Sequence, residues 1–448
     1  MYLSVQRCFR FGREFIWVSS GQFSAAVGSL IVLRVFTDFL GPAQFGELTL
    51  GMTAGTLIGV VAFSGPGLAV MRFFTTAHEA CQVDSFIRAS WSVLINRVWI
   101  MCGLVGLILG GLWLTGNWIW KWLALAAVCQ ALFTACTTIL DGAQNAARQR
   151  IVVAWHSGLG QWLRLLIALA FFPIFGKTST VAMCSYTVTA LVVLVSQCFF
   201  FASYRRCFIT TQLPVTDAYV QEWSNQIAKY AWPAVFFGIF GWMQNSSERW
   251  MLQIFTDTKT VGYYAALTQA GYAPMMLASN VVSQLMMPIL FNRAGDGSNE
   301  ARMEQSHHLS LRILLISMLF TFGAVGVASL THRQLFALLV SPEFRQVSEL
   351  MPLMVLSGGI FSCGYATSLM LLSGTETRSL LRPKAGSALL GMGFSFFGAM
   401  LYGLEGVVWG SILFSFTFLV WVLIMAWQKG CLNVIKGGLR KKKDDGFN

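Results

Sequence analysis

Charged residues are scarce in this 448-residue sequence. Asp, Glu, Lys and Arg make up 11% of it, whereas hydrophobic residues make up 56% and the mean hydropathy is +0.63. An average soluble protein contains about 25% charged residues. The shortage excludes an ordinary soluble fold, because so few charges cannot cover a water-exposed surface of this size. Most of the chain is therefore expected to lie in lipid.

Signatures of enzymes and metal sites are also missing. No Walker-type phosphate loop occurs, and the His-Glu-Ala-Cys-Gln sequence at 78–82 lacks the second histidine of a zinc-binding helix. None of the ten cysteines falls in a predicted outer loop, so neither a disulfide framework nor a structural metal is indicated. The longest of these loops, 331–349, is too short for the catalytic domain of a membrane glycosyltransferase. We predict a protein that is not an enzyme and uses no cofactor. The one bound species left open is a proton or sodium ion that couples transport.

Long hydrophobic runs, by contrast, are abundant. A membrane-spanning helix needs roughly 20 mainly apolar residues, because its backbone must satisfy its own hydrogen bonds in hydrocarbon. Twelve segments qualify: 15–36, 48–70, 93–114, 118–140, 151–175, 181–202, 230–255, 263–291, 309–330, 350–373, 385–402 and 407–427. The sequence predicts an all-α integral membrane protein with about 12 transmembrane helices.

The distribution of Lys and Arg predicts the orientation, since positive loops tend to stay on the cytoplasmic side. With the N-terminus inside, the inner segments hold most of the 31 basic residues, and mainly Lys177, Lys259, Arg333 and Arg345 remain outside. Both termini are then cytoplasmic. The net charge of +12 is spread over many short loops and a tail that can touch anionic lipid, so no nucleic-acid partner is indicated.

The predicted helices form two sets of six. The expected divisions are an N-terminal cytoplasmic segment at 1–14, a first lobe at 15–203, a cytoplasmic connection at 204–228, a second lobe at 229–427 and a basic cytoplasmic tail at 428–448. Every other connection is short. This organisation suggests an internal duplication.

Short sequence matches support the duplication. Residues 33–38 and 252–257 share Leu, Phe, Thr and Asp at corresponding places. A turn follows each of these segments and ends at Gly46 in the first half and at Gly262 in the second. Nine residues after each of these glycines lies the glycine of an Ala-Gly pair, Gly55 or Gly271. Because each copy has an even number of helices, the two lobes are expected to be related by a pseudo-twofold axis along the membrane normal. Two such bundles favour transport by alternating access.

Several motifs resemble those of bacterial polysaccharide transporters. The Leu-Gly-Pro-Ala-Gln-Phe-Gly turn at 40–46 is similar to a turn of that family, and so are Tyr-Ala-Trp-Pro at 230–233, Val-Gly-Tyr-Tyr at 261–264 and the segment 141–150. Glu-Arg at 248–249 replaces the frequent Asp-Arg of the family. The chain thus resembles the O-antigen and polysaccharide flippases of the multidrug/oligosaccharidyl-lipid/polysaccharide exporter superfamily.

This resemblance implies a bacterial inner-membrane protein of lipopolysaccharide or related polysaccharide biosynthesis. It would flip an undecaprenyl-pyrophosphate-linked oligosaccharide from the cytoplasmic to the outer leaflet, next to partners such as a polysaccharide polymerase. Two alternatives remain open at this point: a cation-coupled multidrug antiporter of the same superfamily, and a membrane scaffold of glycan assembly that transports nothing.

Arg164 is the clearest candidate for a functional charge inside the membrane. It lies near the middle of 151–175, with Gln161 on the same helix face. An Arg at a helix centre costs roughly 2.5 to 3.5 kcal/mol even on the mild insertion scale, so it is expected to face water or a partner. It is either a cationic point for the substrate's pyrophosphate or half of a structural ion pair.

The second half contains further candidates. Six polar residues follow one another at 244–249; among them Glu248 is a candidate coupling site for a cation or proton, and Arg249 is a candidate substrate ligand. Adjacent positions point about 100° apart, so these two side chains are poor mutual partners. Gln269, Tyr272, Asn280 and Gln284 share roughly one face and suit either sugar hydroxyls or helix packing.

Two more acidic sites are coupling or gating candidates. Asp141 ends a polar stripe of Gln130, Thr134 and Thr137, and its competing interpretation is a capping or loop residue. Arg34 and Asp38 lie four apart near the outer end of the first helix. A local ion pair worth a few tenths of a kcal/mol is the competing interpretation there.

Overall fold

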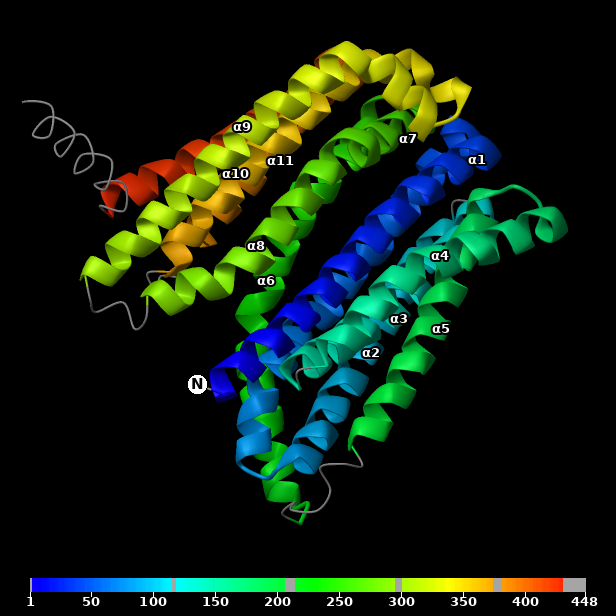
Figure 1. Cartoon of the computed structure of the whole chain (residues 1–448). Helices are drawn as coiled ribbons and strands as arrows, with labels where there is room; N and C mark the ends of the chain where they lie inside the picture. The colour runs from blue at the N-terminus through cyan, green and yellow to red at the C-terminus, as the bar shows by residue number, and fades with distance from the viewer. Residues whose placement is uncertain are drawn as a thin grey trace, which may run out of the picture. The chain divides into compact units, whose positions relative to one another are not determined.

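The computed structural model describes residues 2–114, 118–147, 149–205, 214–294, 300–373 and 381–429, and these contain helices and turns but no strand (Figure 1). The elements are α1 (Tyr2–Glu79), α2 (Val83–Leu114), α3 (Trp118–Ala146), α4 (Arg150–Phe175), α5 (Ser179–Arg205), α6 (Asp217–Phe255), α7 (Thr258–Leu267), the π-helical turn η2 (Thr268–Tyr272), α8 (Ala273–Ala294), α9 (Glu300–Leu339), the 3-10 helix η3 (Pro342–Leu350), α10 (Met351–Ser373) and α11 (Leu381–Gln428). The predicted all-α class is confirmed.

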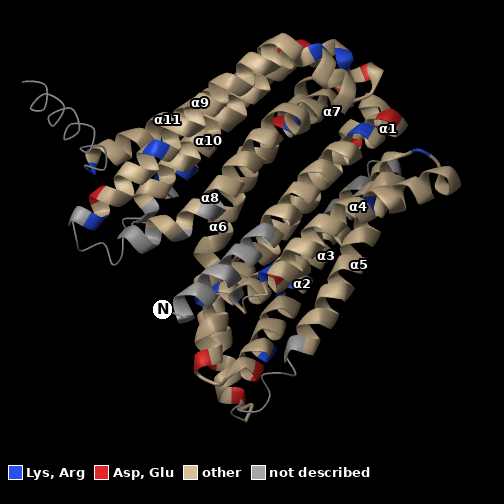
Figure 2. Ribbon diagram, viewed as in Figure 1, with Lys and Arg blue, Asp and Glu red and all other residues tan. Residues whose placement is uncertain are grey.

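Eight stretches of the described residues are long and apolar enough to cross a membrane. Two of them, Ser19–Glu79 and Arg382–Gln428, contain 61 and 47 residues, about twice the length that one crossing needs. Acidic and basic side chains gather toward helix ends and turns, and long uncharged stretches separate them (Figure 2). Large apolar side chains such as Leu319, Leu330 and Tyr402 are exposed. A surface of this kind is stable in lipid, and the protein is a multi-pass membrane protein.

The two double-length helices each bend at a glycine with a positive φ. Gly41 has φ 65° and ψ 174°, and Gly403 has φ 57° and ψ −127°. Glycine adopts these angles because it has no Cβ. In α11 the two halves run back along each other: the backbones of Gly398 and Gly406 touch, and no side chain would fit at either position.

The chain divides into two compact units, unit 1 (Met1–Trp242) and unit 2 (Met243–Asn448), and α6 runs through the boundary. In unit 1, α1 packs against α3 and α4, and α5 packs against α3 and α4. In unit 2, α10 is the central helix and contacts α8, α9, α11 and η2. The sequence predicts a boundary between two membrane lobes earlier in the chain, at 204–228. That boundary stays a prediction.

The start of α6 differs from the sequence prediction. Residues 217–228 were expected in the connection between lobes, but they are helical. Trp223 and Ile227 are buried in an apolar cluster with Phe74 and Phe86, and the Trp223 Nε1 donates to Gln82 Oε1 at 2.9 Å. The predicted connection is therefore helical in this part, because Trp223 and Ile227, four residues apart, bury one face of the helix.

Corresponding positions of the predicted repeat make corresponding contacts in the two units. The hydroxyl of Thr37 donates to Leu33 O at 2.9 Å, and that of Thr256 donates to Leu252 O at 2.6 Å. Phe36 packs edge-on against Phe172 of α4. In unit 2, Phe255 packs edge-on against Phe396 of α11. The two matched segments thus make equivalent contacts, and the duplication itself stays a prediction.

Candidate functional site

Unit 2 contains a polar cavity of about 350 Å³. It is lined by Gln244, Asn245, Glu248, Arg249, Tyr264, Thr268, Gln269, Tyr272, Ala273, Met276, Leu277, Asn280, Met354, Ser411 and Phe414. The polar side chains come chiefly from α6, α7, η2 and α8, and α10 and α11 contribute a largely apolar wall. Five residues predicted from the sequence therefore meet here: Glu248, Arg249, Gln269, Tyr272 and Asn280. The side chain of Gln284 lies outside the described residues.

Helix α6 supplies the charged side of this cavity. Gln244 anchors the helix to α11, because its Nε2 donates to Lys384 O at 3.1 Å and to Ser387 Oγ at 3.0 Å. Glu248 is only 7% exposed, and the Nε of Arg249 is buried without a hydrogen-bond partner. Among the described ion pairs none joins Glu248 to Arg249, as expected for adjacent positions on a helix. Within the described residues the two charges therefore do not form an ion pair with each other.

The π-helical turn η2 shapes the opposite side. The hydroxyl of Thr268 donates to Tyr264 O at 2.8 Å, and the Tyr264 hydroxyl lies 3.0 Å from Ser411 Oγ. Central helix α10 comes close behind this turn, since a Cβ on Gly358 would lie 2.9 Å from Tyr272 O. Single π-helical turns inside α-helices occur frequently at functional sites. This one presents Gln269 and Tyr272 to the cavity.

Sequence reasoning missed Tyr264, Thr268 and Ser411 as cavity residues. Tyr264 and Thr268 lie four apart, which places them on one helix face, and this spacing was the available signal. Ser411 comes from α11, far away in the sequence. Only its hydrogen bond with Tyr264 of α7 identifies it.

The cavity combines one cation, one carboxylate and several neutral hydrogen-bonding groups. A guanidinium binds phosphate through charge-assisted, often bidentate hydrogen bonds. Amides such as those of Gln269 and Asn280 can donate to and accept from sugar hydroxyls. Chemically, the site suits an anionic ligand that also carries hydroxyl groups, with Glu248 as a separate place for a cation or proton.

In unit 1, Arg164 makes local and aromatic contacts. Its Nη1 donates to Gln161 Oε1 at 3.0 Å, and its guanidinium carbon lies 3.9 Å from the ring centroid of Tyr186 on α5. The Arg164 Nε is buried without a hydrogen-bond partner. Within the described part of the chain no carboxylate lies within 4 Å of this guanidinium, so the structural ion pair finds no partner there. Arg164 and Gln161 are brought together as predicted.

A largely apolar groove of about 320 Å³ also occurs in unit 1, between α1 and α3. The stripe predicted along α3 borders it in part: Gln130 Nε2 donates to Thr134 Oγ1 at 3.0 Å, and both residues line the groove. Thr137 does not line it, is 9% exposed and bonds to Thr134 O. Thr138 takes its place, because steps of four residues keep to this face.

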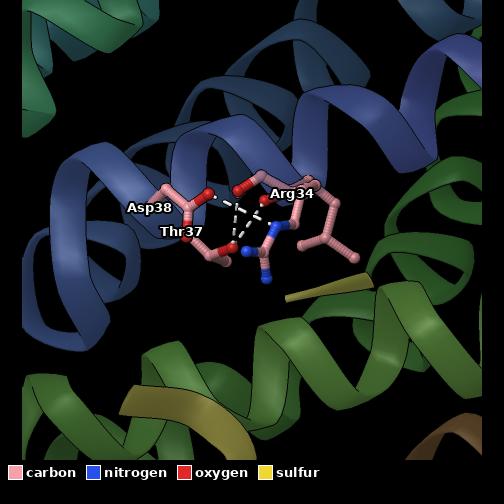
Figure 3. A network of polar contacts seen from close by, with 4 residues as sticks. Arg34, Thr37 and Asp38 are labelled. Carbon is pink, nitrogen blue, oxygen red and sulfur yellow. Dashed lines mark hydrogen bonds and ion pairs between the residues drawn. The ribbon is translucent and has the colours of Figure 1, made fainter. Parts of the chain in front are cut away.

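The remaining two acidic candidates have clear partners. Asp141 accepts a hydrogen bond from Gln197 Nε2 of α5 at 2.7 Å, and its capping interpretation is wrong because α3 continues to Ala146. Arg34 Nε lies 3.3 Å from Asp38 Oδ2, next to Thr37 (Figure 3). The local ion pair expected between Arg34 and Asp38 is present.

A sequence model of a family described as polysaccharide biosynthesis proteins matches residues 11–292, more than half of the chain. The chain belongs to the polysaccharide biosynthesis protein family. The resemblance seen in the motifs is thereby confirmed. No curated protein sequence matches this family member significantly.

Solved structures show which fold this polysaccharide biosynthesis protein has. It is similar to the lipid II flippase MurJ in an inward closed conformation, with TM-score 0.68, 11% identity, and coverage of 94% of this chain and 89% of that one. It is also similar to an inward-facing multidrug resistance MATE transporter of the MOP superfamily, with TM-score 0.65, 13% identity, and coverage of 94% and 95%. A MOP superfamily transporter from Pyrococcus furiosus, whose binding pocket is described as having reverse polarity, matches with TM-score 0.51, 18% identity, and coverage of 96% and 93%. At such identities these matches establish the fold alone.

Proposed function

We propose that this protein is a flippase that moves an undecaprenyl-pyrophosphate-linked oligosaccharide, an O-antigen or related repeat unit, from the cytoplasmic to the outer leaflet. The observation that carries the proposal is that Arg249 lines the unit 2 cavity together with the neutral polar side chains of Gln269, Tyr272 and Asn280. Arg249 neutralises the pyrophosphate, and the neutral groups bind sugar hydroxyls. Arg164 with Gln161 is a second cationic point, in unit 1.

The proposed membrane arrangement has twelve crossings in two lobes. The two halves of α1 and α2 to α5 supply six, and α6, the α7 to α8 stretch, α9, α10 and the two halves of α11 supply six more. In this proposal the protein lies in a bacterial inner membrane, and the basic residues of the inner segments support cytoplasmic termini. The lipid tail stays in the bilayer while the glycan head passes through a polar interior by alternating access. A proton or sodium ion at Glu248 couples the movement.

The proposal is tested by replacing Arg249 in cells that depend on this protein for surface glycan. Arg249→Ala should insert at the wild-type level and lower surface glycan at least about tenfold, since a charge-assisted hydrogen bond contributes about 1.5 to 3 kcal/mol. Lipid-linked oligosaccharide should accumulate on the cytoplasmic side, and Arg249→Lys should restore part of the export. Arg333→Ala is the control, because Arg333 is exposed and lies 3.7 Å from Glu349. Normal export by a stably inserted Arg249→Ala protein would refute the assignment.

Multidrug antiport is the second candidate, and the buried carboxylate of Glu248 in the same cavity favours it. A cationic drug would bind at Glu248 and be repelled by Arg249. Efflux of a cationic dye from cells that express the wild type or Glu248→Gln separates the two functions. A flippase gives no dye efflux with either protein, whereas an antiporter gives efflux that Glu248→Gln abolishes and Arg249→Ala increases.

A further inference from the structure

An open groove runs along helix α11, where its two halves meet. It has a volume of about 500 Å³ and shares no lining residue with the polar cavity of unit 2. Its floor is made of backbone, because Gly398 and Gly406 touch and a Cβ on Gly410 would lie 3.2 Å from the backbone of Phe394. The missing side chains of these glycines leave room for a ligand.

Apolar and aromatic side chains form the walls of this groove. Phe397, Leu401 and Trp409 are all more than half exposed, so the rest of unit 2 leaves them uncovered. The ring of Phe397 packs edge-on against Phe396, which packs edge-on against Phe255 of α6. The wall is therefore held in place by the protein, and its outer surface faces hydrocarbon in a membrane.

The groove has the depth of one membrane leaflet. It extends from the turn at Gly403 to Phe394 and Leu413, nine and ten residues away. At about 1.5 Å per helical residue this is about 14 to 15 Å, half of a hydrocarbon core of about 30 Å. The turn lies at a membrane surface, because α11 is long enough for two crossings and its halves run back along each other. One acyl chain of that leaflet spans the same depth.

Glu405 supplies a negative charge at the surface end of the groove. Its side chain is exposed, and it forms no ion pair with the Lys and Arg residues that the structure describes. Tyr402 and Trp409 line the groove within six residues of Gly403, and such side chains are typical of the depth of lipid headgroups. A protonated amine complements the carboxylate, and the hydroxyl and indole N–H can donate to a phosphate.

We propose that this groove binds a phospholipid whose headgroup carries a primary amine, as phosphatidylethanolamine does. The acyl chain lies along the apolar walls, and the ammonium donates to the Glu405 carboxylate. Chain contacts give little selectivity, since bulk hydrocarbon is as apolar as the groove. The headgroup decides instead: a choline group cannot donate a hydrogen bond to Glu405, and an anionic headgroup is repelled by it. The bound lipid covers the contact between Gly398 and Gly406 and stabilises the helix pair.

Thermal unfolding of the purified full-length protein in detergent tests this site. Phosphatidylethanolamine, phosphatidylcholine or phosphatidylglycerol with the same acyl chains is titrated into the micelles. The wild-type Tm should rise and saturate at the lowest concentrations with phosphatidylethanolamine, because a ligand that binds only the folded state stabilises it. Glu405→Gln should weaken this binding roughly three- to tenfold, since the pair forms at the water interface and is partly screened. Glu343→Gln is the matched control, because Glu343 is an exposed carboxylate of η3 that does not line the groove.

A phosphatidylethanolamine with a photoreactive acyl chain locates the bound lipid. In phospholipid nanodiscs its cross-links should concentrate at 394–413 in the wild type and Glu343→Gln and decrease there in Glu405→Gln. Equal stabilisation by phosphatidylglycerol, undiminished binding by Glu405→Gln, or cross-links spread evenly over the exposed helices overturns the proposal. Cross-links between two copies of the chain at 394–413 also overturn it, because a second copy then covers the groove. None of these outcomes affects Arg249 and the proposed flippase function.

Discussion

The guanidinium of Arg164 stacks on the ring of Tyr186, with the guanidinium carbon 3.9 Å from the ring centroid. Tyr186 is itself buried and packs edge-on against Phe36. A cation over an aromatic face contributes about 0.5 to 2 kcal/mol. Arg164 lies near the middle of its predicted span and is thus held in place by a ring from α5. Its Nε still has no hydrogen-bond partner.

We predict that Arg164→Ala inserts at a near-normal level and abolishes surface glycan, with Arg164→Lys partly active. Tyr186→Leu keeps the cation but removes the ring, so it should lower the Tm while retaining export. Membrane protein level, Tm and surface glycan are measured for the three variants. If Arg164→Ala and Tyr186→Leu lose folded protein to the same extent and remain export-competent, Arg164 is a packing residue.

Gly55 should not tolerate a methyl group. A Cβ there would lie 2.6 Å from the backbone oxygen of Ala127 on α3, so the helices would have to separate. We predict that Gly55→Ala lowers the free energy of unfolding by about 1 to 3 kcal/mol. The same change at Gly59 is the control, since its Cβ would lie 3.8 Å from Ala131. Thermal unfolding should show a lower Tm for Gly55→Ala and an unchanged or higher Tm for Gly59→Ala.

Asp257 caps α7 and should make its stability pH-dependent. Its Oδ1 accepts a hydrogen bond from Thr260 N at 2.7 Å, and hydrogen bonds from Thr260 lower the pKa of Asp257 below its ordinary value of 3.8. The stabilisation is therefore fully present above pH 3.8 and is lost as the pH falls through the lower pKa of the folded state. Asp257→Ala should cost about 1 kcal/mol at neutral pH.

This cost should shrink in acid, because the protonated wild-type side chain caps less well. The Tm of the wild type and of Asp257→Ala is compared from neutral pH to below 3.8. Asp257→Asn keeps a capping oxygen that does not titrate, and its Tm should lack this part of the pH dependence. A constant difference between wild type and Asp257→Ala across the range would contradict the capping role.

Membrane topology is tested with single cysteines in a background from which all ten native cysteines have been removed. Thr178 lies in the turn after α4 and Lys259 in the first helical turn of α7, and both residues are exposed. Thr178→Cys and Lys259→Cys should react with an impermeant thiol reagent in intact cells, because the positive-inside pattern puts these turns outside. Glu79→Cys, at the end of α1, should react only after the cells are opened. Labelling of Glu79→Cys in intact cells would reverse the orientation.

The sequence by itself determined the membrane class, the approximate helix positions and the Arg34–Asp38 pair. Lipid forces each crossing to satisfy its own backbone hydrogen bonds, so hydrophobic runs mark the helices directly. The ion pair follows from a spacing of four on one helix, which needs no knowledge of any other element. The motifs also placed the chain in its family, because they are local stretches of sequence.

Only the tertiary structure decided which intramembrane polar residues meet. Glu248 and Arg249 share a cavity with Ser411, and Asp141 bonds to Gln197, across long separations in sequence. Such contacts depend on the rotation of each helix about its axis and on how closely its neighbours approach. Glycines such as Gly358 and the π-helical turn at Thr268–Tyr272 set that approach. Hydrophobic periodicity does not determine these rotations in lipid, where apolar side chains are stable on every face of a helix.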